Sequence, residues 1–277
     1  MAIITISRGS MSGGEALAGR LAEKLGYPSV GREVIVAAAE KLGVDEQFLS
    51  EKFMRSPSLW ERMTSNRRFY LVAVQAALVE HAAKGDLIYH GNAGHLLLRG
   101  IPSVFRVRLI APLDFRIRAV MERQKTGRDA AESYIRRVDE ERVRWTRFIY
   151  GVDWTDPSLY DLAVNLERMS MDTACLMIAE AVRQPEFAMT QEVKKELRDF
   201  LLACRVHLAL ATNPQTRHFE LEVTASDGDV EITGVLPAAY KLGVASTRDE
   251  DEIRRTAQSV GGVKSARLSA QRMPTPD

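Results

Sequence analysis

The chain has 277 residues, of which 45% are hydrophobic and 27% charged, a length that suits two domains of unequal size. A formal net charge of +1 excludes a global field that would draw the protein onto nucleic acid or an anionic membrane, so any anion site must be local. We expect a cytoplasmic protein with no signal peptide, no transmembrane segment and no nucleic-acid partner. We expect Cys175 and Cys204 to be reduced thiols packed in helices.

The first 26 residues predict a strand, a glycine-rich turn and a helix, in that order. Residues 2–7 alternate and are rich in isoleucine, as in a short buried strand. Leucines at helical spacing follow over residues 15–25, and Gly26 is placed to end that helix.

Strands and helices continue to alternate as far as residue 185. We expect strands at 87–90, 104–110 and 162–164, and helices at 69–83, from about 114, and at 172–182. This alternation predicts an α/β fold in which helices cover both faces of a parallel sheet.

The glycines after the first strand have the spacing of a phosphate-binding loop, G-x-x-x-x-G. In such a loop the main-chain amides converge on phosphate oxygens at the positive end of a helix. The pattern normally continues with Lys and then Ser or Thr, whereas here Glu15 and Ala16 follow. A turn without a ligand is the alternative interpretation. The predicted nucleotide-binding residues are Gly9, Ser10, Ser12, Gly13, Gly14 and Glu15.

The pattern changes near residue 185, and a small α+β unit is predicted over residues 190–272. We expect helices at 192–210 and 249–260 and strands at 219–223, 230–234 and 263–269. Asp227-Gly228 predicts a hairpin turn between the first two strands. The tail 273–277 is expected to fray. The chain is therefore divided into domains at 1–185 and 190–272.

The segments Ile4-Thr-Ile-Ser-Arg-Gly-Ser-Met-Ser-Gly-Gly14 and Leu21-Ala-Glu-Lys-Leu-Gly26 resemble the cytidylate kinase-like family of P-loop kinases. The helix that contains Arg116 and Arg123 also fits this family. The resemblance implies a three-layer P-loop NTPase fold, ATP and Mg²⁺ as cofactors, and a nucleoside monophosphate, CMP or dCMP, as acceptor. Glu15 departs from the lysine or arginine that the family has at this position.

The resemblance extends to two segments that face the acceptor in the family. Gly31-Arg-Glu-Val-Ile35 implies that Arg32 lies near the nucleoside monophosphate, although Gly31 replaces an aspartate. Ile88-Tyr-His-Gly-Asn-Ala-Gly94 places Asn92 where the family has a phosphate-binding arginine. Asparagine has neither the charge nor the bidentate geometry of arginine, so phosphate binding should weaken.

A third similarity concerns Arg136-Arg-Val-Asp-Glu-Glu-Arg-Val-Arg144, which resembles the Asp-x-x-Arg lid of the family. It implies catalytic roles for Arg137, Asp139 and Arg142, and Asp139 can orient Arg142 from one helical turn away. A solvated, salt-bridged helix is the alternative. We predict Arg144 and Asp161 as further substrate contacts, and for Asp161 a cap on the last strand is the other interpretation.

Three histidines, His81, His90 and His95, lack the carboxylates or cysteines that would complete a metal site, so no protein-held metal is predicted. Packing is the expected role of each, although His90 and His95 flank the loop around Asn92 and one of them could touch a bound phosphate. Trp60, Trp145 and Trp154 are expected to be packing residues, with no aromatic-basic pattern for RNA.

The C-terminal segments Asp227–Val235 and Ser259–Val263 resemble a BON domain, a module associated with attachment to membranes or ligands. This implies a protein or ligand partner, although the mixed charges of residues 248–255 do not favour a membrane. Two functions remain open. The first is phosphoryl transfer from ATP to a nucleoside monophosphate. The second is a catalytically impaired kinase relative that senses a nucleotide or anion and is coupled to the BON-like domain.

Overall fold

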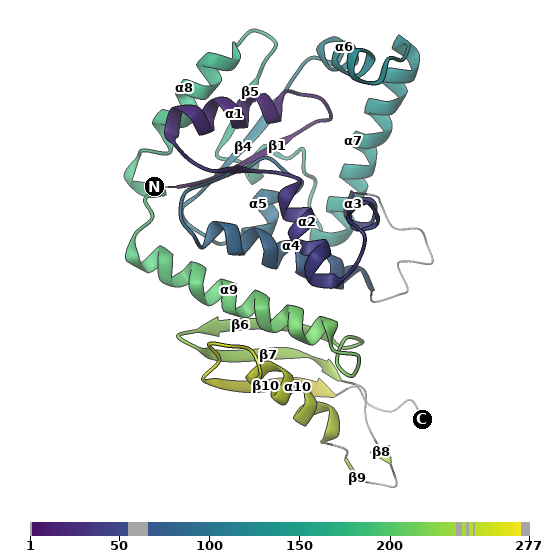
Figure 1. Cartoon of the computed structure of the whole chain (residues 1–277), viewed down its shortest axis with the longest axis vertical. Coiled ribbons are helices and arrows are strands. Elements are labelled where there is room, and N and C mark those ends of the chain that lie inside the picture. The colour runs from purple at the N-terminus through teal and green to yellow at the C-terminus, as the bar shows by residue number, and fades with distance from the viewer. Residues whose placement is uncertain (1, 55–65, 237–239, 242–243, 246, 273–277) are drawn as a thin grey trace.

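A computed structural model describes residues 2–54, 66–236, 240–241, 244–245 and 247–272. Trp60 and the tail 273–277, for which packing and fraying were predicted, lie outside these residues. Figure 1 shows a larger α/β unit joined by one long helix to a smaller sheet. No helix in the described ranges is long and apolar enough to cross a membrane.

The larger unit is built on a five-stranded sheet with the order β2-β3-β1-β4-β5. Every neighbouring pair is parallel. Its strands are β1 (Ile3–Arg8), β2 (Ser29–Val30), β3 (Leu87–Tyr89), β4 (Val104–Ile110) and β5 (Leu162–Asn165). β1 is central and pairs with β3 and β4, so the loop that follows it lies at the middle of the carboxyl edge of the sheet, where open α/β sheets bind ligands.

Helices pack on both faces of this sheet, as the alternation of elements predicted. The helices of this unit are α1 (Gly14–Leu25), α2 (Glu33–Leu42), α3 (Glu46–Met54), α4 (Asn66–Ala82), α5 (Gly94–Leu97), α6 (Leu113–Gln124), α7 (Arg128–Tyr150) and α8 (Met171–Ala181). One hydrophobic cluster joins α1 and α8 to one face, and another joins α2 and α4 to the opposite face. The predicted α/β fold with a parallel sheet is confirmed.

Glycines in the left-handed conformation mark both ends of α1. Gly13 precedes the helix at φ 82°, and Gly26 follows it at φ 72° with its N–H bonded to the Ala22 carbonyl. The predicted end at Gly26 is confirmed, because a residue without Cβ adopts this conformation at little cost. The 23-residue helix α7, which contains the lid-like sequence, ends in the same way at Gly151, with φ 67°.

The smaller sheet has three strands in the order β10-β7-β6. Its elements are α9 (Gln191–Thr212), β6 (Glu220–Ser226), β7 (Asp229–Leu236), α10 (Arg248–Gln258) and β10 (Ser265–Arg272), with the two-residue strands β8 (Tyr240–Lys241) and β9 (Val244–Ala245) between β7 and α10. β6 and β7 are antiparallel, and Asp227 and Gly228 between them have φ of 52° and 92°. The predicted hairpin is therefore confirmed, because two positive φ values suit the twist of its strands.

Helix α9 belongs to the hydrophobic cores of both units. Val193, Leu197 and Cys204 pack in the cluster that contains α2 and α4. Val206 and Leu210 pack with the smaller sheet and α10. Figure 1 shows α9 lying between α4 and that sheet. The helix therefore joins the two units by packing as well as by chain connection.

Candidate functional site

The loop between β1 and α1 lies close against two arginine side chains at two of its glycines. A Cβ on Gly9 would lie 2.9 Å from the guanidinium carbon of Arg116, and a Cβ on Gly14 would overlap the Arg8 side chain. The loop main chain is therefore enclosed by two arginines, one from the end of β1 and one from α6. Both place positive charge beside main-chain amides at the start of a helix.

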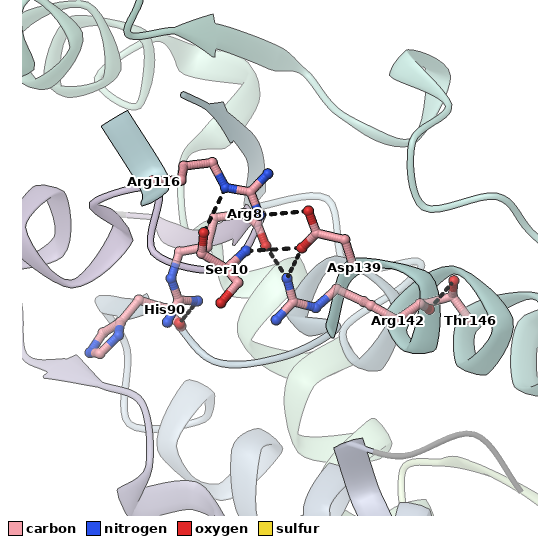
Figure 2. Close-up of polar contacts among 7 residues, drawn as sticks. All are labelled: Arg8, Ser10, His90, Arg116, Asp139, Arg142 and Thr146. Carbon is pink, nitrogen blue, oxygen red and sulfur yellow. Dashed lines mark hydrogen bonds and ion pairs between the residues drawn. The ribbon is translucent and has the colours of Figure 1, made fainter. Parts of the chain in front are cut away.

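Helix α7 is bonded directly to this loop. The Ser10 amide donates to Asp139 Oδ1 at 3.1 Å, and Arg116 donates from Nε to the Ser10 carbonyl at 2.7 Å. Arg116 also donates to Asp139 Oδ2 at 2.5 Å, which closes the network shown in Figure 2. One amide of the predicted phosphate loop is thus already bonded to a carboxylate of the lid-like helix.

Arg8 and Arg142 lie side by side where β1 ends. Arg142 donates to the Arg8 carbonyl, and Arg8 donates to the carbonyl of His90, which lies in the loop after β3 (Figure 2). Burial and the charge of Arg8 lower the pKa of Arg142 to about 10, and Asp139 opposes this only in part. Burial also lowers the pKa of Arg8. The two cations remain protonated at neutral pH, and an anion between them would relieve their repulsion.

A cavity of about 790 Å³ opens beside these arginines. Its walls come from the end of β1, the start of α1, residues 31–35, α3, the loop after β3, and α7. The lining residues include Arg8, Glu15, Arg32, Asn92, Arg142 and Trp154. The volume is within the range of small-molecule sites. Trp154 lies 5.4 Å from the Arg142 guanidinium, in a cation–π arrangement that holds this arginine in the wall.

His95 lies in the same wall but is almost fully buried, with 4% of its surface exposed. Its Nδ1 is 2.7 Å from the Ser7 hydroxyl, and its ring stacks on Tyr160 at 4.7 Å. Burial, with the charges of Arg106 and Arg108, lowers the pKa of His95 to about 4. The ring is therefore neutral at physiological pH and acts as a hydrogen-bonding partner of Ser7 rather than as a cation.

Several of the predicted site residues come together around this cavity. Of the six predicted loop residues, only Glu15 lines the cavity; Gly9, Ser10, Ser12, Gly13 and Gly14 do not, and Ser12 is buried. The exposed carboxylate of Glu15 lines the cavity. Arg32 and Asn92 also line it, but Arg32 is largely exposed and forms an ion pair with Glu46.

Outside the glycine loop, four predicted residues do not line this cavity: Arg137, Asp139, Arg144 and Asp161. Arg137 is exposed and lies over the Tyr134 ring, and Arg144 is exposed with Glu140 at 3.9 Å. Asp161 bonds Arg106 at 2.6 and 3.0 Å and lines a separate cavity of about 290 Å³. Asp139 lies closer to Arg116 than to Arg142, which is 3.9 Å away, so its strongest partner is not the arginine one turn along the helix.

Arg8, Arg116 and Trp154 are site residues that sequence reasoning did not assign. Arg8 and Arg116 lay within segments that resemble the family, but no pattern indicated that they would meet the loop. Trp154 was predicted as a packing residue. It is indeed buried, yet it also forms part of the cavity wall. The signal that could have revealed Arg8 is its position as the last residue of the central strand, directly before the glycine loop.

The position at which P-loop kinases hold Mg²⁺ does not fit that ion in this chain. Ala16 has no side-chain hydroxyl to offer, and Glu15 beside it is a carboxylate in the position of a phosphate-binding lysine. The Ser12 hydroxyl, a possible substitute, is buried and has no hydrogen-bond partner among the described residues. We therefore derive no step through a metal ion.

The chain is similar to known proteins over its first two-thirds. The model of the cytidylate kinase-like family matches residues 3–168. Cytidylate kinases of Methanopyrus kandleri and Ignicoccus hospitalis are 27% and 28% identical to the chain, covering 65% and 61% of it and 92% of each relative. A solved protein from Eubacterium ventriosum is 22% identical with a TM-score of 0.49, covering 66% of this chain and 99% of its own. The family match covers more than half of the chain, which therefore belongs to the cytidylate kinase-like family.

Proposed function

We propose that this protein transfers the γ-phosphoryl group of ATP to a nucleoside monophosphate, with CMP or dCMP as the acceptor. The observation that carries the proposal is the position of Arg142, which reaches from the lid-like helix to the end of the central strand. There it meets one cavity lined by the glycine-loop residue Glu15 and by Asn92. The segments to which we assign the donor, acceptor and lid roles thus line a single cavity.

The roles of the residues follow from their positions. The amides of Ser12, Gly13 and Gly14, at the start of α1, would hold the donor phosphates. Arg142 would neutralise charge on the transferring group, since phosphoryl transfer depends almost entirely on positioning and electrostatics. Asp139 would position α7 on the loop through Ser10 and Arg116.

The remaining predicted contacts keep the roles that the family resemblance implied. Arg32 and Asn92 would contact the acceptor from the cavity wall. Arg137 and Arg144 face solvent, so they could reach the substrates only if α7 moved towards the cavity on binding. Asp161 would contact a substrate only by giving up hydrogen bonds that it accepts from Arg106, three in all. The names of the archaeal relatives favour cytidylate as acceptor.

A second candidate is a nucleotide- or anion-sensing module without turnover. Two carboxylates favour it: Glu15 replaces the phosphate-binding lysine, and Asp139 bonds the Ser10 amide that a phosphate would otherwise use. Loss of one charged transition-state contact lowers rates by a factor on the order of 10²–10³, so several losses together could abolish turnover. The C-terminal unit, which we propose as a BON-like domain over residues 190–272, would then pass the bound state to a partner through α9.

The test is an assay of purified full-length protein with ATP, Mg²⁺ and each common nucleoside monophosphate, in which diphosphate product is measured by chromatography. We expect CDP or dCDP to form fastest. Arg142→Met should lower kcat at least 100-fold. Arg136→Met, on the exposed side of the same helix and paired with Glu132, should leave it unchanged.

Absence of product with every acceptor would reject the kinase proposal. Calorimetric titration with ATP and CMP then decides the second candidate. Binding without turnover supports the sensing module, and no binding of either nucleotide rejects it as well.

A further inference from the structure

Arg8 lies in the cavity wall and forms no ion pair among the described residues, although the Glu15 carboxylate lines the same cavity and partly offsets the effect of burial on the pKa of Arg8. Among the described residues, no Asp or Glu oxygen within 4.0 Å of its guanidinium forms an ion pair. Among the described residues, the only acceptor for the Arg8 guanidinium is the His90 carbonyl. It engages one of the five N–H donors of that guanidinium. Partial burial of an unpaired charge is costly unless a ligand completes its coordination.

A second guanidinium makes the electrostatic environment of Arg8 less favourable. Arg142 donates to the Arg8 carbonyl and so brings a second guanidinium to the same wall. Asp139 of the lid-like helix hydrogen-bonds Arg116 and the Ser10 amide and lies 3.9 Å from Arg142. Two guanidiniums that share one wall, with free donors on Arg8, form a site for an oxyanion such as a phosphoryl group.

Arg8 contacts both the loop assigned to the donor and the loop assigned to the acceptor. Its aliphatic stem crosses Gly14, where the donor loop enters α1. Its guanidinium is bonded to His90, in the loop that carries Asn92 on the acceptor side. A group that bridges these two loops lies between donor and acceptor, which is where the transferring phosphoryl group passes.

We propose that Arg8 is a catalytic residue that binds the transferring phosphoryl group in place of the lysine that is absent at position 15. This rests on the proposed function. In the step, the bond from the γ-phosphorus to the β–γ bridging oxygen of ATP breaks, and a bond to an acceptor phosphate oxygen forms. ADP and a nucleoside diphosphate result, and no proton has to leave when the acceptor phosphate is a dianion.

Two variants of Arg8 separate the effect of its charge from that of its hydrogen bonds. The ligands are inorganic tripolyphosphate and ATP. Arg8→Lys keeps the charge, whereas Arg8→Gln keeps a donor and an aliphatic stem without it. By calorimetry on the full chain, we expect Arg8→Gln to bind tripolyphosphate at least tenfold more weakly than wild type, and Arg8→Lys to bind at least fivefold more tightly than Arg8→Gln. The control Arg20→Gln removes an exposed α1 charge paired with Asp172 and should bind as wild type does.

Equal affinities of the Lys and Gln variants, or wild-type affinity in Arg8→Gln, would overturn the proposal and leave Arg8 as a structural link to His90. If Arg8→Gln does not fold, the ATP affinity of Arg8→Lys is compared with that of wild type at a temperature at which both proteins are fully folded. A threefold to tenfold loss of ATP affinity then supports the role of the planar guanidinium, and no loss rejects it.

Turnover distinguishes this proposal from the function on which it rests. If wild type forms no diphosphate but its tripolyphosphate affinity follows the charge at position 8, the kinase function fails and the oxyanion site stands. If wild type and Arg8→Gln turn over equally well, the function stands and the role of Arg8 fails.

Discussion

At the scale of single residues, the most consequential departures are Glu15 and Ala16, which follow a loop whose glycines still have the spacing of a phosphate site. The double change Glu15→Lys with Ala16→Thr keeps the main chain of the loop and restores the missing charge and hydroxyl. It should therefore increase ATP affinity at least tenfold. Calorimetric titration with ATP measures this, and Glu15→Gln shows how much comes from removing the negative charge alone. Unchanged affinity in the double variant would mean that the loop cannot admit a triphosphate.

His95 makes a second prediction at this scale. Its pKa in the folded protein is about 4, below the ordinary value near 6.5 of the unfolded chain. The unfolded state therefore binds more protons between these values, and the stability contributed by neutral His95 is lost as pH falls from about 6.5 towards 4. The free energy of unfolding should therefore fall by at most about 1.4 kcal/mol per pH unit over this range.

Urea unfolding at several pH values between 4.5 and 7.5 measures that slope. His95→Asn should be less stable than wild type at pH 7.5 but should show a flatter decline towards acid. The exposed His218, changed to Asn, is the control and should decline in parallel with wild type. Parallel curves for all three proteins would refute the assignment of the acid sensitivity to His95.

At the scale of elements, the contact between α7 and the glycine loop depends on one carboxylate. Asp139 is bonded to Ser10 and to Arg116, and the side chains of Asp139 and Arg116 are only 26% and 12% exposed. Asp139→Asn removes the charge from both bonds and leaves Arg116 poorly compensated. We expect a loss of about 1–2 kcal/mol in unfolding free energy, reduced from the value of a fully buried pair by the partial exposure.

The matched control is Glu140→Gln, the next residue on α7, whose carboxylate is largely exposed and 3.9 Å from Arg144. It should change stability by less than about 0.5 kcal/mol. Chemical denaturation measures both variants. Equal stability of the two would show that α7 is held on the loop by other contacts.

At the scale of the whole molecule, α9 makes the two units depend on each other. Ile232 is fully buried in the smaller sheet, in the cluster that also contains Val206 and Leu210 of α9. The opposite side of α9 packs in the larger core. Ile232→Ala should cost about 2–5 kcal/mol locally, and the shared helix should transmit the loss to the larger unit.

Tryptophan fluorescence reports on the larger unit alone, because Trp60, Trp145 and Trp154 all precede residue 185. We expect the fluorescence midpoint of Ile232→Ala to fall together with the far-UV circular dichroism midpoint. A fluorescence midpoint equal to that of wild type, with an earlier step in circular dichroism, would show that the smaller sheet unfolds independently.

The sequence alone determined secondary structure wherever it depends on residues that are close together in the chain. Alternating isoleucines, the helix end at Gly26 and the hairpin at Asp227-Gly228 follow from side-chain periodicity and backbone sterics, which act within a few residues. The family motif similarly depends on contiguous residues. Helices α2, α3 and α5 were not predicted, because short helices are stabilised by their packing partners rather than by their own sequences.

Tertiary structure alone decided the partners of the charged groups. Asp139 lies 3.9 Å from Arg142, the partner that helical spacing allows, but its shorter ion pair, at 2.5 Å, is with Arg116, which is 23 positions earlier on another helix. Arg8 became part of the site because folding brings the end of β1 against the loop after β3 and against α7. Helical spacing predicts which residues can meet along one element. Which ion pair forms depends on distances between elements that are far apart in the chain, and only the packed fold determines them.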